Sequence, residues 1–193
     1  MVKYTKEKGS RKDTWAKKKW LTVKAPVVFG DRVLAETPAV KTAHTEGRIL
    51  EVPMSEVTGN FKHFRSKIKV KITSTNDNEA TTEYVGHEVV RDQVSRAVRR
   101  WSSRIDSVDD VNTKDNVKMR IKSLVLTRRR VNTSIKDEIR KLVSSLVFDI
   151  AKTMDKDQII VEINDNQIQK QLSIAASKIY PIKSVEIRKT EVL

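Results

Sequence analysis

Two segments of the chain alternate basic and apolar residues, a spacing that suits contact with phosphate groups. The basic positions are Lys67, Lys69 and Lys71 within residues 65–73, and Lys118, Arg120 and Lys122 within residues 117–126. Because neighbouring side chains of a β-strand point to opposite faces, each segment would turn a row of cations to one side. No acidic residue interrupts either row, so we expect both rows to contact the phosphates of a nucleic acid. For one strand alone, a solvated sheet face or an edge protected by lysines against aggregation is the alternative.

Further basic residues cluster in the N-terminal segment and in two short arginine-rich runs. Residues 1–24 hold nine Lys or Arg and only two acidic residues, a composition typical of a tail that orders on its partner. The planar guanidinium of arginine matches phosphate oxygens and stacks on exposed bases. Together the rows, the runs and the tail predict nucleic-acid binding. The predicted RNA-binding residues are Lys3, Lys6, Lys8, Arg11, Lys12, Trp15, Lys17, Lys18, Lys19, Lys24, Lys67, Lys69, Lys71, Arg96, Arg99, Arg100, Lys118, Arg120, Lys122, Arg128, Arg129 and Arg130.

Two tryptophans lie close to the basic tail. Trp15 is surrounded by basic residues and is the better candidate for stacking on a base. Trp20 adjoins an apolar strand and is therefore expected in the core.

The sequence offers little for catalysis or for binding a metal ion. The five glycines are not spaced as in a phosphate-binding loop, and the three histidines lack the spacing of metal ligands. The absence of cysteine excludes disulfides, thiolate metal sites and thiol catalysis. The acidic cluster lacks the glycine and the terminal glutamate of an EF-hand, and is expected to be a polar hairpin loop. Its members are Asp106, Asp109, Asp110 and Asp115. We therefore expect no catalytic residue, no metal site and no cofactor.

The formal net charge of +14 results from 39 Lys and Arg against 25 Asp and Glu. A polyanionic partner relieves the self-repulsion of such a chain and releases counterions on binding. No apolar run approaches the roughly 20 residues of a membrane span, and no apolar segment follows the basic N-terminus as in a signal peptide. No membrane partner is expected. Two alternatives stay open: a chromatin-like protein that binds duplex DNA, and an RNA-processing enzyme that uses the carboxylates of residues 106–115.

The elements that would position these residues form an α+β fold. Strands are predicted at residues 20–23, 65–73, 81–90, 117–126 and 184–190, with turns at 76–78 and 106–116. Val94, Ala97, Val98 and Trp101 follow helical spacing and predict a helix that Asp92 caps, with Trp101 on its buried stripe. Longer helices are predicted at 133–154, capped by Ser134, and at 165–179, ending before Pro181. Residues 157–163 fit either a helix or a strand.

Several short motifs follow one another along the chain. They are Lys17–Trp20 with Val23–Pro26, Arg91 and Asp92 with Trp101, Asp110 and Val111 with Thr113 and Asp115, then Arg120 and Thr127, Ile139–Lys141, and Ile179–Pro181 with Val185, Arg188 and Lys189. In this order they resemble the archaeal and eukaryotic small-subunit ribosomal proteins of the eS-one (S-three-A-e) family. The likeness begins near residue 17, and the short tail without a long C-terminal extension resembles the archaeal members.

The resemblance implies a structural, non-enzymatic component of the small subunit of cytoplasmic ribosomes. It implies binding to small-subunit rRNA on the platform, near the rRNA 3′ end and the mRNA exit, with ribosomal proteins and mRNA as neighbours. It also implies a mostly antiparallel, β-barrel-like core with flanking helices. From the pattern of elements we expect a basic rRNA-binding tail (1–19), a β-rich lobe with one helix (20–132) and a helical lobe that ends in a strand (133–193).

Overall fold

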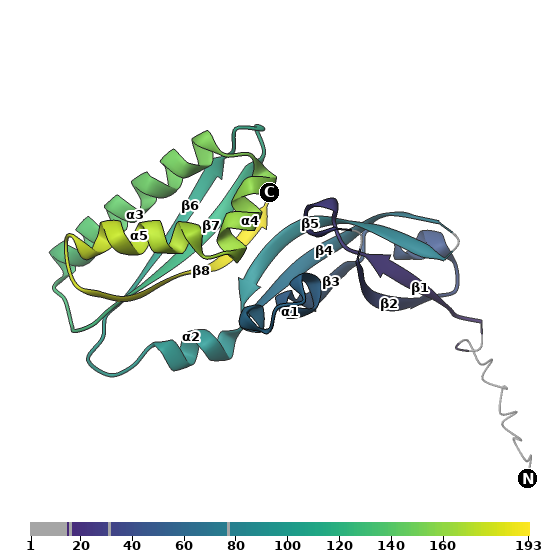
Figure 1. Ribbon diagram of the computed structural model, residues 1–193, viewed down its shortest axis with the longest axis horizontal. Helices are drawn as coiled ribbons and strands as arrows, with labels where there is room; N and C mark the ends of the chain where they lie inside the picture. Colours follow the sequence, from purple (N-terminus) through teal and green to yellow (C-terminus); the bar gives the residue numbers. More distant parts are fainter. Residues whose placement is uncertain (1–14, 16, 31, 77) are drawn as a thin grey trace, which may run out of the picture.

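One sheet of eight strands runs through the part of the chain that the computed structural model describes, which is residues 15, 17–30, 32–76 and 78–193 (Figure 1). The strands are β1 (Lys19–Lys24), β2 (Val33–Ala39), β3 (Ile49–Pro53), β4 (Ser66–Thr75), β5 (Glu79–Val89), β6 (Arg104–Asn112), β7 (Lys118–Thr127) and β8 (Ile182–Val192). The helices are α1 (Met54–Thr58), α2 (Arg91–Ala97), α3 (Thr133–Thr153), α4 (Lys156–Asn164) and α5 (Gln167–Ser177).

The sheet is mixed and open. Its strand order is β2-β1-β5-β8-β7-β6, and β4 pairs with both β3 and β5 off this path. All pairs are antiparallel except β1 with β5. The mixture of strands and helices agrees with the expected α+β class, but the sheet does not close, so the barrel-like core is not confirmed.

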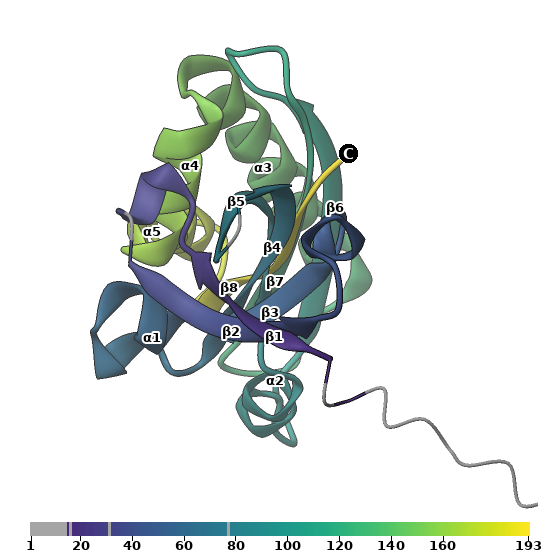
Figure 2. The ribbon, with the colours of Figure 1, turned by 90° about the vertical axis from the view of Figure 1, so that its right-hand side faces the viewer.

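The two largest of the four hydrophobic clusters lie mainly on either side of the junction between β5 and β8. We call β1–β5 with α1 the N-terminal lobe, and β6–β8 with α3–α5 the C-terminal lobe. In the C-terminal lobe, α3, α4 and α5 lie on one side of the sheet (Figures 1 and 2), and Ile139, Leu172 and Ile121 of β7 belong to the buried cluster between them. This core contains residues from both sides of residue 132, where the boundary between the two lobes was expected. The division of the chain at residue 132 remains a prediction.

Helix α2 lies apart from α3, α4 and α5 and covers the opposite face of the sheet (Figure 2). Its Val94 packs against Leu124 and Leu126 of β7, whose side chains point away from α3. At the end of the helix, Lys183 of β8 donates from Nζ to the carbonyl oxygen of Ala97 at 3.0 Å. A cation at this position also complements the negative end of the helix dipole.

The lobes meet where β5 crosses β8, at Gly86 to Glu88 and Lys189 to Glu191. Thr190 is fully buried there. Its Oγ1 lies 2.7 Å from the Tyr84 hydroxyl and accepts the backbone N–H of His87 at 3.1 Å. A Cβ added at Gly86 would lie 2.4 Å from the Thr190 carbonyl oxygen, so this crossing requires glycine.

Several sequence predictions are confirmed. Residues 65–73 and 81–90 pair as the hairpin of β4 and β5, and α3, α5 and β8 occupy the predicted 133–154, 165–179 and 184–190 to within a few residues. The ambiguous segment 157–163 is helical. It lies in α4, which begins with a capping box formed by Asp155 and Gln158.

Other predictions were wrong. Residues 106–112 form most of β6 and not a turn. The inward positions of this strand are occupied by the apolar Ile105 and Val111 and, between them, by the polar Ser107 and Asp109. That mixture concealed the strand period. Neither Asp92 nor Ser134 is an N-cap: α2 follows Val90 and α3 follows Asn132.

Gly86→Ala should lower the free energy of unfolding by about 3 kcal/mol, because the added methyl group must displace the backbone of β8. Urea denaturation would measure this. Gly47→Ala is the control, since its φ of +79° strains alanine but the methyl group meets no atom within 4 Å; it should cost only about 1 kcal/mol. Equal losses for the two variants would show that the close crossing is not required.

Candidate nucleic-acid interface

The two arginine-rich runs, far apart in the sequence, lie side by side in the structure. Ser103 and Thr127 join the loops that carry them: the Thr127 N–H donates to the Ser103 carbonyl, and the Ser103 N–H donates to Thr127 Oγ1, both at 3.0 Å. The Ser103 Oγ also accepts the N–H of Val131 at 3.1 Å. Both residues are buried, so water does not compete with these bonds. We call the surface that results the arginine end; it comprises Arg99, Arg100, Arg128, Arg129 and Arg130.

Trp101 lies within the arginine end. The helix α2 ends at Ala97, and Trp101 is 70% exposed with a φ of +69°. The guanidinium of Arg130 lies over its ring, 5.0 Å from the centroid. The prediction that Trp101 belongs to the buried stripe of a helix was therefore wrong, and this exposed ring was missed as a functional candidate. The sequence held one relevant signal, since Trp101 directly follows Arg99 and Arg100.

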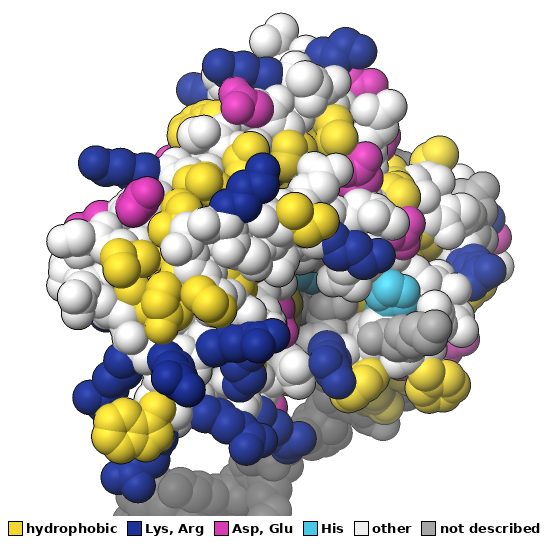
Figure 3. Space-filling model, turned by 60° about the vertical axis from the view of Figure 1, so that its left-hand side comes forward, with side chains coloured by type: hydrophobic (Ala, Val, Ile, Leu, Met, Phe, Trp, Pro, Cys, Tyr) yellow, Lys and Arg dark blue, Asp and Glu magenta, His cyan; other side chains and the backbone are white. Residues whose placement is uncertain are grey.

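The charge of the arginine end is not neutralised. All five arginines are exposed, and none of them has an ion pair with a described acidic residue. Figure 3 shows Lys and Arg side chains gathered at the end of the molecule where Figure 1 places α2. Arg96, predicted to act with this cluster, differs from it because it pairs with Asp92 at 3.4 Å.

The row on β4 is largely neutralised by neighbouring strands. Lys69 lies 2.8 Å from Glu88 of β5 and 3.1 Å from Glu51 of β3, and Lys67 lies 3.9 Å from Glu51. The hydrogen bond from Lys69 lowers the pKa of Glu88, and the bonds to Glu88 and Glu51 raise the pKa of Lys69. The expectation of cations without neutralising acids was wrong for these two lysines. Lys71 is exposed and has no ion pair with a residue that the structure describes.

The row on β7 is paired in the same way. Arg120 donates to both oxygens of Asp110 on β6, at 2.6 and 2.8 Å. Lys122 donates to Glu191 of β8 at 2.9 Å. Hydrogen bonds from Lys189 and then from Lys122 hold the pKa of Glu191 at about 2. Of this row, only Lys118 is without an ion pair to a described residue.

Much of the predicted tail lies outside the described residues. These positions are Lys3, Lys6, Lys8, Arg11 and Lys12. Lys17 and Lys19 are exposed, and Lys24 pairs with Glu79 at 2.7 Å.

The two tryptophans beside the tail are both exposed. Lys18 Nζ lies 4.0 Å from the centroid of the Trp15 ring, and Trp15 is 58% exposed. Trp20 is 59% exposed, so the prediction that it belongs to the core was wrong. It lies at the start of β1, where the first two residues are exposed.

The acidic cluster is dispersed rather than gathered around a site. Asp106 pairs with Arg104, Asp110 pairs with Arg120, and Asp115 accepts the backbone N–H of Lys156 at 3.1 Å. Among the described residues, no group of three His, Cys, Asp or Glu side chains is placed to hold a metal ion. None of the described helices is both long enough and apolar enough to cross a membrane.

Known proteins are similar in sequence to this chain over almost its full length. The model of the ribosomal S3Ae family matches residues 6–193. A small ribosomal subunit protein eS1 from Desulfurococcus amylolyticus is 37% identical over 189 residues, which are 98% of this chain and 89% of that protein. The chain belongs to the ribosomal S3Ae family. The proteins of the same name from Saccharolobus islandicus and Saccharolobus solfataricus are each 37% identical over 185 residues, 96% of this chain and 89% of theirs.

Membership of the ribosomal S3Ae family confirms the resemblance seen in the sequence and its archaeal type. It gives the chain a structural role in the ribosome and in translation, not an enzymatic one. The RNA-processing alternative loses its support, because the carboxylates it required do not form one site: Asp106 and Asp110 are in ion pairs, and Asp109 is buried in β6.

The Glu191 ion pairs make stability depend on pH. Because the pKa of Glu191 falls from 4.5 to about 2 on folding, its stabilisation is complete above pH 4.5 and is lost as the pH falls towards 2. Glu191→Gln should therefore cost about 1 kcal/mol at pH 7, after allowance for solvent screening of partly exposed pairs. Urea denaturation between pH 7 and pH 3 should show the difference from wild type shrinking. Glu36→Gln, an exposed position on β2, should cost nothing at any pH; a pH-independent loss in Glu191→Gln would contradict the assignment.

Proposed function

We propose that this chain binds small-subunit rRNA, and that the arginine end is its principal contact surface. The observation that carries the proposal is the convergence of five exposed arginines around an exposed tryptophan, with no described carboxylate paired to them. Paired cations release fewer counterions on binding than free ones, because their charge is already balanced. The arginine end is therefore a stronger candidate than the two strand rows.

The conformation of Trp101 supports a role in binding. A bulky residue with positive φ is a genuine outlier, and such backbone strain is frequent at functional sites. The exposed ring gains nothing from burial in the isolated protein. It is instead placed to stack on an unpaired base while the surrounding arginines contact phosphates.

The finer placement within the ribosome rests on the family. We propose a position on the platform of the small subunit, near the rRNA 3′ end and the mRNA exit, with ribosomal proteins and mRNA as neighbours. The basic segment 1–19 would order on rRNA there, because binding to a polyanion relieves the repulsion among its like charges. The relatives named small ribosomal subunit protein eS1 support the small subunit as its place in the ribosome.

Replacing Arg99, Arg100, Arg128 and Arg129 together by Ala should weaken binding to small-subunit rRNA fragments. The slope of log K against log salt should fall by about 3 units, because each lost phosphate contact removes roughly 0.7 to 0.9. A matched control removes the same charge from paired cations: Lys67, Lys69, Arg120 and Lys122 to Ala. An equal effect of both sets, or tighter binding of duplex DNA than of rRNA in competition, would contradict the proposal; the second outcome would favour the chromatin-like alternative.

Trp101→Ala tests the stacking contribution separately. Affinity for a single-stranded rRNA segment should fall by about 1–3 kcal/mol, without a change in the salt slope, since no charge is lost. Trp20→Ala provides the control, because that ring is comparably exposed but lies outside the arginine end. Equal losses in fluorescence-anisotropy titrations of both variants would argue against a specific stacking site.

A further inference from the structure

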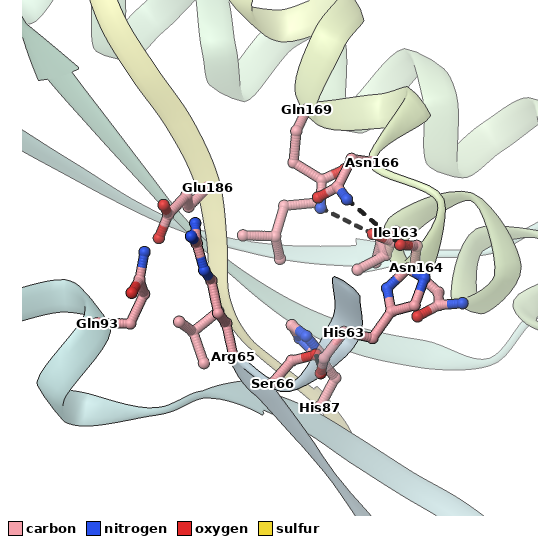
Figure 4. Close-up of a pocket in the computed structure, with 12 residues that line it drawn as sticks. His63, Arg65, Ser66, His87, Gln93, Ile163, Asn164, Asn166, Gln169 and Glu186 are labelled. Atoms are coloured by element: carbon pink, nitrogen blue, oxygen red, sulfur yellow. Dashed lines mark hydrogen bonds between the residues drawn. The ribbon is translucent and has the colours of Figure 1, made fainter. Parts of the chain in front are cut away.

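A cavity of about 160 Å³ lies at the junction of the two lobes. Its walls come from the segment before β4, from β5 and β8, from α2, and from the α4–α5 turn (Figure 4). In the space-filling view the surface is hollowed beside histidine side chains (Figure 3). None of the residues predicted to bind RNA lines this cavity, and the arginine end does not contribute to it.

The cavity concentrates polar atoms that lack a partner. Eight buried side-chain nitrogen or oxygen atoms among the described residues have no hydrogen-bonding partner, and four of them belong to residues of this cavity. The four atoms are His87 Nδ1, Asn164 Oδ1, Gln169 Oε1 and Glu186 Oε2. Burying a polar atom without a hydrogen bond costs stability, so such a concentration indicates a site that a ligand satisfies.

These groups are held in place by the fold. Gln169 is 8% exposed, and its Nε2 donates to the Ile163 carbonyl at 2.8 Å, which leaves its Oε1 buried without a partner in the wall of the cavity (Figure 4). His87 is also 8% exposed, and burial lowers its pKa to about 4, so its imidazole is neutral at pH 7. Burial raises the pKa of Glu186, and its Oε2 has no hydrogen-bond donor among the described residues.

Three of the four atoms are oxygens, which accept hydrogen bonds, so a ligand that satisfies them must donate hydrogen bonds. Arg65 also lines the cavity and is the cation that acts on Glu186. A positively charged guest, such as a lysine or arginine of a neighbouring protein, would be repelled by Arg65. A neutral group with donors on one edge and acceptors on another would satisfy both Glu186 and Arg65.

We propose that this cavity binds a guanine base extruded from single-stranded RNA. Among the four bases, only guanine presents two adjacent donors, N1–H and the N2 amino group, which match the two oxygens of a carboxylate such as Glu186. Its O6 and N7 acceptors match the guanidinium of Arg65. A volume of about 160 Å³ suits one planar base better than a drug-sized ligand.

Two exposed aromatic rings lie close in the sequence to residues that line the cavity, and they suit stacking on the neighbouring nucleotides. Phe61 and Phe64, on either side of the lining residue His63, are 88% and 59% exposed. Arg65 lies over the Phe64 ring, 5.4 Å from its centroid. Exposed rings beside a cation are typical of surfaces that stack on unpaired bases. The inference rests on the proposed function, because it assumes that the chain meets single-stranded RNA.

The test compares three pentanucleotides, UUGUU, UUAUU and the same sequence with central inosine, which lacks the N2 amino group. Fluorescence anisotropy should show at least about tenfold tighter binding of the guanine pentamer than of the adenine one, with inosine between them. Glu186→Gln should abolish the preference, and Asn164→Ala should reduce it. Glu36→Gln is the matched control on an exposed strand position and should retain it. Thermal melting would verify that each variant is folded.

The controls separate this proposal from the proposed rRNA contact surface. The quadruple arginine-end variant should weaken all three pentamers equally and leave their ratio unchanged. In ¹⁵N-labelled protein, millimolar guanosine monophosphate should shift the amide signals of residues lining the cavity more than adenosine monophosphate does. Equal affinities of the three pentamers in the wild type, a preference that survives in Glu186→Gln, or equal shifts by both nucleotides would overturn the guanine site. The rRNA contact surface would stand in each case if the arginine-end variant still showed the smaller slope of log K against log salt.

Discussion

The crossing of β5 and β8 around Thr190 is the contact on which the rest of the structure depends. One threonine hydroxyl serves both Tyr84 and the backbone of His87, and Gly86 allows the strands to approach closely enough for those bonds. Because β8 also pairs with β7 along almost its full length, the crossing fixes the C-terminal lobe against the N-terminal one. Both the cavity at the lobe junction and the surface on which α2 packs are formed by strands that this crossing aligns.

Most basic side chains of the rows on β4 and β7 are paired with carboxylates, whereas those of the arginine end are not. Cross-strand neighbours on a sheet lie within reach of long side chains, so a basic residue on one strand readily meets an acidic residue on the next. Lys69 and Arg120 are neutralised in this way. Loops held by Ser103 and Thr127 carry arginines without such neighbours. The positive charge available to attract a polyanionic partner therefore lies mainly outside the basic rows of β4 and β7.

The sequence predicted those parts of the fold in which periodicity is local and uniform. The β4–β5 hairpin and the α3 helix follow from alternating and helical spacing, respectively. Strand β6 was missed because polar residues occupy half of its inward positions, and Trp101 was misplaced because its spacing continues a helix that ends at Ala97. The convergence of the arginine runs and the cavity at the lobe junction depend on long-range pairing, which no local pattern records. Sheet closure could not be predicted for the same reason.

The position of β8 also sets the order in which the molecule can form. This strand follows every other described strand in the chain, yet it lies in the middle of the sheet, between β5 and β7. Until β8 is in place, both neighbours present open edges, and the carbonyl at the end of α2 lacks the Lys183 that binds it. Pairing between distant strands is slow because the chain loses the entropy of loop closure before the strands form stabilising contacts. Meanwhile, the unpaired edges of β5 and β7 can associate with other chains. A nascent chain thus carries two incomplete half-sheets from the completion of β7 at Thr127 until β8, which begins at Ile182, is made and joins them.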